Sequence, residues 1–226
     1  MLKAPKFWYQ SNFSILAILL LPVSLIWITG TYLKKKFAKP IRSKIPVIAI
    51  GSAIIGGSGK TPSVIYVCEI LEKIGYKPHV ISRGYGGSAN EVIKVSPEMS
   101  YSVVGDEAIM MSKYYPTWVS KNKYNAFAMA EKDGANILVL DDALQSYNIF
   151  KDLNIYVYDS IQSFGNKLIV PSGPLRESIS SVLNRSQIVF LVNTDNCLEI
   201  SKNKFQQNIN YEISIKPEMR DKRLMP

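Results

Sequence analysis

The sequence predicts an α/β fold in which a mostly parallel sheet carries helices on its faces. Two observations support this prediction. Short, wholly apolar runs recur along the chain, as strands buried on both faces of a parallel sheet do. These runs alternate with helical patterns from residue 46 to residue 193, which is the order of a doubly wound sheet. An apolar share of 47% in 226 residues is ample for such a core.

Each element can be placed from its pattern and from the Gly and Pro residues around it. We expect strands, in chain order, at 46–52, 79–84, 92–95, 118–119, 137–140, 154–159 and 187–192, with a weak one at 211–215. We expect helices at 62–74, 105–114 and 125–132, and one that ends near residue 184.

The most informative stretch joins the first strand to the first helix through Gly56-Gly57-Ser58-Gly59-Lys60-Thr61. We call residues 52–59 the phosphate loop. In a strand–glycine loop–helix unit the glycines let backbone N–H groups approach a phosphate, and the helix N-terminus adds positive charge. Lys60 can reach a terminal phosphate, and the Thr61 hydroxyl is placed to hold a magnesium ion. The strict pattern has a glycine where this chain has Ile54, so a chance glycine-rich turn is the alternative.

The second landmark is the carboxylate pair Asp141-Asp142, which follows the apolar run 137–140. In folds with a phosphate loop, a strand-end aspartate helps to hold the magnesium ion that the loop hydroxyl also binds. The alternative is a polar strand exit that only turns the chain. Together the two landmarks predict binding of a nucleotide, with phosphoryl transfer or hydrolysis as the chemistry.

Two further polar pairs have ordinary interpretations on the residues alone. Asp106 and Glu107 open a helix, where acidic residues complement the helix dipole. Arg176 lies in the Pro- and Gly-rich loop 171–177 and could clamp a phosphate, although a surface salt bridge with Glu177 is the ordinary interpretation.

The N-terminal segment is apolar from Phe13 to about Ile28 and ends in a basic cluster, Lys34, Lys35, Lys36, Lys39, Arg42 and Lys44. Three interpretations compete: a kinked helix in the membrane interface, a membrane-spanning helix and a buried core helix. Pro22 and the short apolar run favour the interfacial helix, with the lysines on anionic lipid. No small-residue cleavage site follows the run, so we expect the remainder of the chain to stay in the cytoplasm.

Composition excludes several classes of function. The net charge of +9 suggests an anionic partner, but the basic residues cluster at the apolar segment, which argues against a nucleic-acid motor. Cys68 and Cys197 show neither metal-ligand spacing nor a disulfide framework. With His79 as the one histidine, catalytic triads and histidine-rich metal sites are nearly excluded.

Six motifs occur in one order along the chain. They are Gly-Gly-Ser-Gly-Lys-Thr-Pro (56–62), Ser-Arg-Gly-Tyr-Gly-Gly (82–87), Val-Gly-Asp-Glu (104–107), Leu-Asp-Asp-Ala-Leu-Gln (140–145), Asp-Leu-Asn-Ile (152–155) and Gly-Pro-Leu-Arg-Glu (173–177). Their order and spacing resemble the tetraacyldisaccharide 4'-kinase family of the lipid A pathway in Gram-negative bacteria. The apolar, lysine-flanked start of the chain also resembles that family.

The resemblance implies a P-loop kinase that uses ATP and Mg²⁺ to phosphorylate the 4'-hydroxyl of tetraacyldisaccharide 1-phosphate. Its implied partners are this lipid A disaccharide precursor and anionic inner-membrane lipid, and its implied location is the cytoplasmic face of the inner membrane. It also implies two parts, a membrane-associated helix with its basic flank at 1–44 and a kinase core lobe at 45–226.

The same resemblance assigns roles to individual positions. Lys60 and Thr61 match the phosphate-loop residues, and Asp141 and Asp142 match the metal-binding pair. Asp106, with Glu107 beside it, matches the catalytic aspartate, which overrides the helix-dipole interpretation. Arg176 matches an arginine linked with the active site.

This sequence departs from the family pattern at three places. Ser146 stands where the family has a histidine, and Gly51-Ser52 replaces Gly-Asn. The family's C-terminal lobe carries a Phe-Pro-Asp-His motif that these 226 residues do not contain. A catalytically impaired nucleotide-binding remnant is therefore one alternative to an active kinase. A membrane-bound ATPase switch is another, although such switches carry a lysine where this chain has Ile55.

Overall fold

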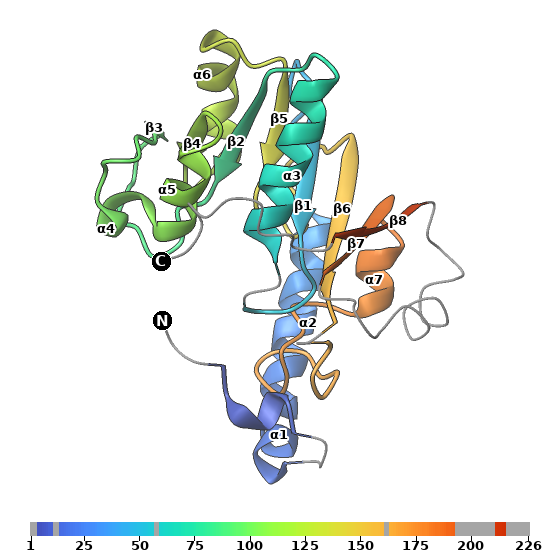
Figure 1. Cartoon of the computed structure of the whole chain (residues 1–226). Helices are drawn as coiled ribbons and strands as arrows, with labels where there is room; N and C mark the ends of the chain where they lie inside the picture. Colours follow the sequence, from blue (N-terminus) through green and yellow to red (C-terminus); the bar gives the residue numbers. More distant parts are fainter. Residues whose placement is uncertain (1–3, 11–13, 57–58, 161–162, 193–210, 216–226) are drawn as a thin grey trace.

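The computed structural model describes residues 4–10, 14–56, 59–160 and 163–192, and the backbone of 211–215. The strands form one sheet in the order β3-β4-β2-β5-β1-β6-β7-β8 (Figure 1). All neighbouring strands pair in parallel except β3, which pairs antiparallel with β4. The predicted α/β class with a mostly parallel sheet is confirmed.

The strands are β1 (Val47–Gly51), β2 (Pro78–Ser82), β3 (Ile93–Lys94), β4 (Thr117–Val119), β5 (Ile137–Leu140), β6 (Leu153–Asp159), β7 (Ile188–Val192) and β8 (Tyr211–Ile215). The helices are η1 (Lys6–Trp8), α1 (Ile15–Leu19), α2 (Leu21–Lys36), α3 (Lys60–Lys73), α4 (Tyr101–Val104), α5 (Asp106–Ser112), η2 (Lys123–Ala126), α6 (Phe127–Lys132) and α7 (Ile179–Leu183).

Several helix boundaries differ from the prediction. The helix expected at 105–114 is α5, which spans Asp106–Ser112, and the short helix α4 before it was not expected. Helix α3 begins at Lys60 instead of Pro62, because the Ser63 N–H already bonds the Gly59 carbonyl. Proline is tolerated in a first turn, where its missing N–H costs no helical hydrogen bond. The predicted helix 125–132 begins earlier, as the 3₁₀ turn η2, and becomes α-helical at Phe127.

The sheet is buried on both faces, as its apolar strands predict. In β1, Val47 and Ala49 join the core under α6 and α7, whereas Ile48 and Ile50 join the core under α3. This alternation follows from the two-residue period of a strand. The sheet is therefore a rigid platform, and the loops at its edge carry the polar chemistry.

The N-terminal apolar run forms two helices, α1 and α2, which are separated at Leu20. Pro22 lies in the first turn of α2 and so does not bend it. Ala17 and Ser24 are the buried residues of these two helices, so the alternative of a buried core helix is wrong. Within the described ranges, none of the helices combines the length and the apolar character needed to cross a membrane.

Candidate active site

The polar loops meet at one edge of the sheet because of the strand order. Strands β2, β5 and β1 are neighbours and run parallel, so their carboxyl ends lie together. The segments that follow these ends are Arg83 onward, Asp141-Asp142 and the phosphate loop. Ligand sites of open α/β sheets form at this edge. The fold therefore brings both sequence landmarks to one place.

The phosphate loop leads directly into α3. Gly59 has a left-handed φ of 69°, and a Cβ there would lie 3.1 Å from the Val192 side chain, so the position favours glycine. The Lys60 ammonium donates to the Gly56 carbonyl over 3.0 Å and thus curls back over the loop. Thr61 is buried in the first turn of α3. The predicted loop residues Gly57 and Ser58 lie outside the described residues.

Asp141 is a buried carboxylate at the end of β5. Its Oδ2 accepts a hydrogen bond from the Ser82 hydroxyl over 3.0 Å, which ties β5 to β2. Its Oδ1 is buried and has no hydrogen-bond partner among the described residues. Burial raises the pKa of Asp141, and the positive charge of Lys123 opposes that rise. An unpaired buried oxygen is costly, so this atom is a candidate ligand for a cation.

Lys123 is a site residue that the sequence prediction missed. Its buried ammonium donates to the backbone carbonyls of Asp141 and Asp142, the latter over 3.1 Å. Burial lowers its pKa, while the two aspartates oppose that change. The neighbouring Lys121 is exposed and bonds Asn90 instead. Nothing in the Lys-Asn-Lys pattern distinguishes the two lysines, because their difference depends on the docking of η2 against β5.

Asp142 and Arg176 form an ion pair that joins two distant loops. Both carboxylate oxygens of Asp142 accept from one guanidinium nitrogen of Arg176, over 3.0 and 2.9 Å. Burial alone would raise the pKa of Asp142, but Arg176 and then Lys60 outweigh it, so the pKa is lowered. The expected surface salt bridge between Arg176 and Glu177 is wrong. Arg176 points to the carboxylate pair, and Glu177 has another partner.

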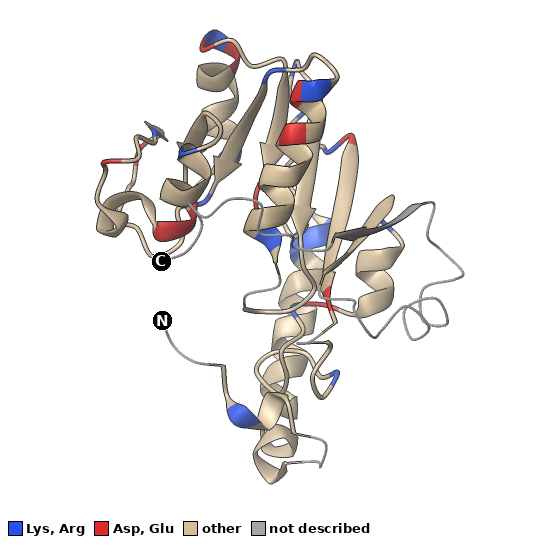
Figure 2. Cartoon of the chain, viewed as in Figure 1, with Lys and Arg blue, Asp and Glu red and all other residues tan. Residues whose placement is uncertain are grey.

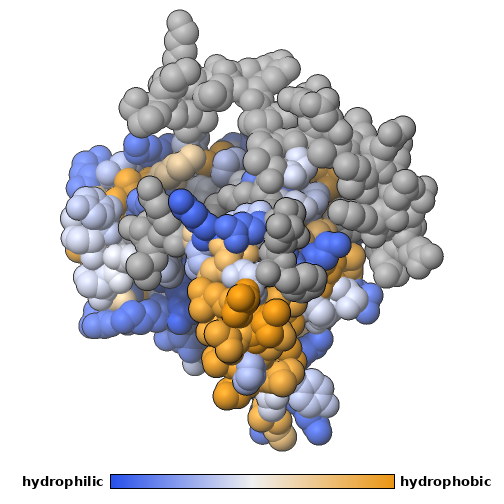
Figure 3. Space-filling model, turned by 90° about the horizontal axis from the view of Figure 1, so that it is seen from below, coloured by the Kyte–Doolittle hydropathy of each residue, from blue (hydrophilic) through white to orange (hydrophobic). Residues whose placement is uncertain are grey.

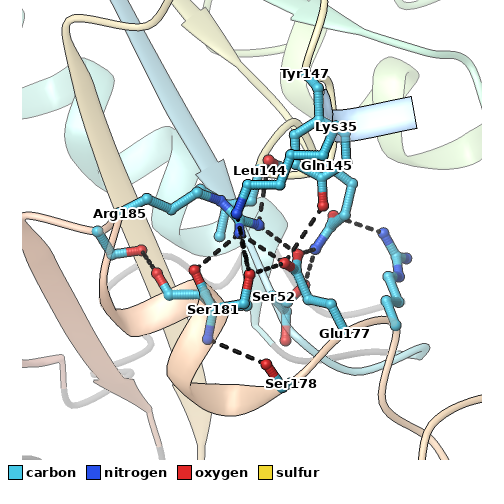
Figure 4. Close-up of polar contacts among 12 residues, drawn as sticks. Lys35, Ser52, Leu144, Gln145, Tyr147, Glu177, Ser178, Ser181 and Arg185 are labelled. Carbon is cyan, nitrogen blue, oxygen red and sulfur yellow. Dashed lines mark hydrogen bonds and ion pairs between the residues drawn. The ribbon is translucent and has the colours of Figure 1, made fainter. Parts of the chain in front are cut away.

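That partner is Arg185, which follows α7 and its C-terminal cap, Asn184. Glu177 is almost fully buried and accepts from Arg185 on both carboxylate oxygens (Figure 4). Gln145 donates to the same carboxylate over 2.9 Å and to the Ser52 carbonyl over 3.1 Å. Arg185 holds the pKa of Glu177 below its usual value, although burial acts in the opposite direction. The network connects the segment after Asp142 to the start of the phosphate loop.

Asp106 and Glu107 begin α5 and differ in environment. Asp106 is exposed, and its Oδ1 accepts the Glu107 N–H over 3.0 Å. Burial raises the pKa of Glu107, and the negative charge of Asp141 raises it further, whereas Lys60 opposes the rise. Glu107 is therefore within electrostatic reach of both landmarks. The geometry brings all the described candidate residues to the same edge of the sheet.

The predicted metal ligands can be tested against this geometry. Among the described residues, no three His, Cys, Asp or Glu side chains are arranged as a metal cluster. The Asp141 Oδ1 and the Thr61 hydroxyl are oxygen donors of the kind that Mg²⁺ prefers. The Asp142 carboxylate is already shared with Arg176. The donor chemistry of Asp141 and Thr61 therefore suits a magnesium ion, whereas Asp142 would have to divide its charge between the ion and Arg176.

Comparison with known proteins identifies the family. A family model described as tetraacyldisaccharide-1-P 4'-kinase matches residues 16–224. The chain belongs to this family. Tetraacyldisaccharide 4'-kinases from Rhodospirillum centenum and Rickettsia canadensis are 36% and 35% identical to it over 198 and 192 residues, which is 86% and 85% of this chain. The chain spans 59% and 58% of the length of these two relatives.

A solved structure of this kinase family supports the fold. The structure is the "apo" form of LpxK from Aquifex aeolicus in complex with ATP, and it aligns with a TM-score of 0.72 at 24% identity. The alignment covers 89% of this chain and 64% of the solved one. At this identity the likeness establishes the shared fold. It agrees with the P-loop type of sheet expected for the 4'-kinase family.

Proposed function

We propose that this chain carries the nucleotide-binding site of a kinase that transfers phosphate from ATP to the 4'-hydroxyl of tetraacyldisaccharide 1-phosphate, in lipid A biosynthesis. Membership of the family supports the reaction. The observation that carries the proposal is the convergence of Lys60, Glu107, Asp141 and the Asp142–Arg176 pair at one edge of the sheet. Such a set of fixed charges suits phosphoryl transfer, in which positioning and charge stabilisation supply most of the catalysis.

Each charged group has a role that follows from its surroundings. Lys60, now on the Gly56 carbonyl, would move to the β- and γ-phosphates. Asp106 is exposed and would accept the proton of the acceptor hydroxyl, whereas Glu107, with its raised pKa, would stay beside it as a second carboxyl. Arg176 would hold Asp142 in place and offset charge that develops on the transferred phosphate.

A bound Mg²⁺ would neutralise phosphate charge and orient the transferred group. The Asp141 Oδ1 and the Thr61 hydroxyl are the groups of this chain that would hold it. The Lys123 ammonium donates a hydrogen bond to the Asp141 backbone carbonyl. This bond would keep the Asp141 carboxylate in position when a cation binds.

The surface of α1 and α2 supports a membrane as partner. Residues 15–33 contain no charged residue, and three lysines occupy the last turn of α2 (Figure 2). Seen from below, the apolar side chains form one continuous patch with hydrophilic residues around it (Figure 3). Its most exposed members are Ile15, Leu19, Leu25 and Ile26. We propose that this patch enters the cytoplasmic face of the inner membrane, where the lysines contact anionic lipid and the acyl-chain acceptor is found.

One assay tests the reaction. The chain is incubated with radiolabelled ATP, Mg²⁺ and detergent-dispersed tetraacyldisaccharide 1-phosphate, and labelled lipid is measured by chromatography. The wild-type chain should label the acceptor. Asp106→Asn should reduce the rate of labelling by about 10²–10⁴-fold. The control Glu98→Gln, at another exposed carboxylate, should leave the rate unchanged. Absence of labelling together with absence of ATP binding would contradict the proposal.

A second candidate function is nucleotide binding with very slow transfer. The sequence has one histidine, His79, which is buried at the start of β2 and accepts from the Trp118 indole. It therefore lies at the other end of the strand from the candidate site and is not placed to assist Asp106. In the same assay, tight ATP binding with turnover at least about a hundredfold below a longer relative would favour this second function.

A further inference from the structure

Helix α2, which carries much of the apolar patch, is bonded to the loop that carries Arg176. The Trp27 indole N–H donates to the Arg176 backbone carbonyl over 3.0 Å. Ser24, one turn earlier, donates to the Ile169 carbonyl over 2.8 Å and accepts the Ser172 N–H over 3.2 Å. Two side chains of one helix therefore fix the beginning and the end of loop 169–177. Since Ser24 is buried, its bonds to Ile169 and Ser172 belong to the interior of the fold.

The same loop is paired with the phosphate loop. The Arg176 N–H donates to the Ala53 carbonyl over 2.7 Å, and the Ile55 N–H donates to the Pro174 carbonyl over 2.9 Å. Ile54 and Leu175, both buried, form an antiparallel bridge between these bonds. This short ladder ends at Ile55, immediately before Gly56. The backbone that precedes the glycines is thus held by residues 174–176.

We propose that Trp27 is a positioning residue for the nucleotide site. Through the Arg176 carbonyl it holds residues 174–176 against the phosphate loop, and it keeps the Arg176 guanidinium on Asp142. Loss of the indole N–H frees the Arg176 carbonyl, which loosens the ladder next to Gly56. The inference deepens the proposed function, because it assigns a control of nucleotide affinity to a helix outside the site.

The surroundings of the bond make it sensitive to lipid. Trp27 is 47% exposed, so water competes with the Arg176 carbonyl for the indole N–H. Acyl chains around α2 would exclude that water and strengthen the bond. By thermodynamic linkage, lipid that stabilises the ladder would raise nucleotide affinity, and nucleotide would raise lipid affinity by the same factor.

The first test uses hydrogen exchange and needs no nucleotide. Trp27→Phe keeps an aromatic ring but removes the donor. Amide exchange of Ile55 and Arg176 should become about 2- to 10-fold faster, the effect of losing one hydrogen bond. The matched control is Thr29→Val on the same helix, since the Thr29 hydroxyl bonds only the Leu25 carbonyl in its own helix. Ser24→Ala should speed exchange at Ser172 and leave Ile55 unchanged. Unchanged exchange at Ile55 in Trp27→Phe would overturn the inference.

The second test measures affinity for a fluorescent ATP analogue, first in detergent-free buffer and then with anionic phospholipid vesicles. Trp27→Phe should bind about 2- to 10-fold more weakly than Thr29→Val, at equal melting temperature without nucleotide. Vesicles should raise the affinity of the wild type and raise it less in Trp27→Phe. Equal affinities of Trp27→Phe and Thr29→Val would overturn the inference. If the wild type binds no nucleotide, the proposed function fails, and the exchange experiment still decides whether Trp27 positions the ladder.

Discussion

Lys60 and Asp142 illustrate how single charges prepare the site before any ligand arrives. The ammonium of Lys60 already lies over the phosphate loop, bonded to Gly56, and its charge helps to keep the pKa of Asp142 low. Arg176 pairs directly with the same Asp142 carboxylate. Two positive charges, one at the start of α3 and one in loop 171–177, thus act on Asp142 before any ligand binds.

We predict that Lys60→Ala reduces ATP affinity by at least about a hundredfold and leaves the fold intact, because the ammonium is a point charge on the β- and γ-phosphates. Isothermal titration with ATP measures the affinity, and circular dichroism checks the fold. Lys73→Ala is the matched control, since Lys73 lies on the same helix but pairs with Glu69 at the surface. Unchanged affinity in Lys60→Ala would refute the phosphate-loop assignment.

Glu177 is the residue on which the loop network depends, and its removal should destabilise the protein. Glu177→Ala leaves the guanidinium of Arg185 without its partner, so we expect a loss of about 3–5 kcal/mol in the free energy of unfolding at pH 7. Glu69→Ala, at an exposed ion pair, should change it by less than about 1 kcal/mol. Urea denaturation measures both. A loss below 1 kcal/mol in Glu177→Ala would contradict the buried network.

The lowered pKa of Glu177 also predicts a pH dependence. A carboxyl whose pKa is lower in the folded than in the unfolded chain stabilises the fold above the unfolded value, here 4.5. That contribution is lost as the pH falls through the lower folded value. Glu177→Gln, which cannot ionise, should therefore be less stable than the wild type at pH 7, and the difference should shrink below pH 4.5. If the difference in stability between Glu177→Gln and the wild type did not depend on pH, the charge of Glu177 would not be what stabilises the fold.

At the level of elements, the turn between α4 and α5 positions Asp106. Gly105 has a φ of 85°, and a Cβ there would lie 2.5 Å from the Tyr85 carbonyl oxygen. This close contact joins the start of α5 to the loop after β2. The catalytic prediction for Asp106 therefore depends on a glycine that brings two elements together.

Gly105→Ala should destabilise the protein by about 1–3 kcal/mol, because the methyl group meets backbone and the conformation is strained. Gly30→Ala is the contrasting control, because nothing lies within 4 Å of a Cβ at this position in the middle of α2. It should leave stability unchanged or raise it by up to about 1 kcal/mol. Denaturant unfolding compares the two. Equal effects would show that the contact with Tyr85 does not constrain the turn.

The elements were predictable from sequence where local pattern decides them. Apolar runs gave β1, β5 and β7 nearly to the residue, and the edge strand β3 and the distant β8 were also expected. Helix starts were less accurate. The start of α3 depends on the conformation of Gly59, and the start of η2 depends on the burial of Lys123, and neither has a periodic signal.

The site was predictable in its landmarks and not in its connections. Lys60, Asp141 and Asp142 follow from strand ends and loop composition. The predicted ion-pair partner of Arg176, its neighbour Glu177, was wrong. The actual partner is Asp142, which is distant in sequence but near in space. Long-range pairs such as Arg176 with Ala53 leave no periodic pattern, since each side of a short ladder contributes only two or three residues. The roles of these residues in catalysis remain predictions.

For the whole molecule, we expect the proposed membrane contact to depend on the apolar patch and the basic flank together. Leu19→Glu combined with Ile26→Glu removes two exposed apolar side chains and adds charge, so affinity for anionic vesicles should fall at least about tenfold. Ile74→Glu, equally exposed but at the end of α3, is the control. Vesicle sedimentation measures the binding. If the double variant still pellets as the wild type does, the membrane contact lies elsewhere.

The ladder between the phosphate loop and residues 174–176 also bears on how the protein is made. A ribosome releases the chain from its N-terminus, so the phosphate loop emerges long before the segment that completes it. Helix α2 emerges earlier still. Its polar side chains bond the carbonyls of Ile169 and Arg176, and these residues have not yet been synthesised at that point. Until then the ladder beside the phosphate loop is absent. From the proposed function we therefore expect a nascent chain to bind ATP only once its synthesis has passed Arg176.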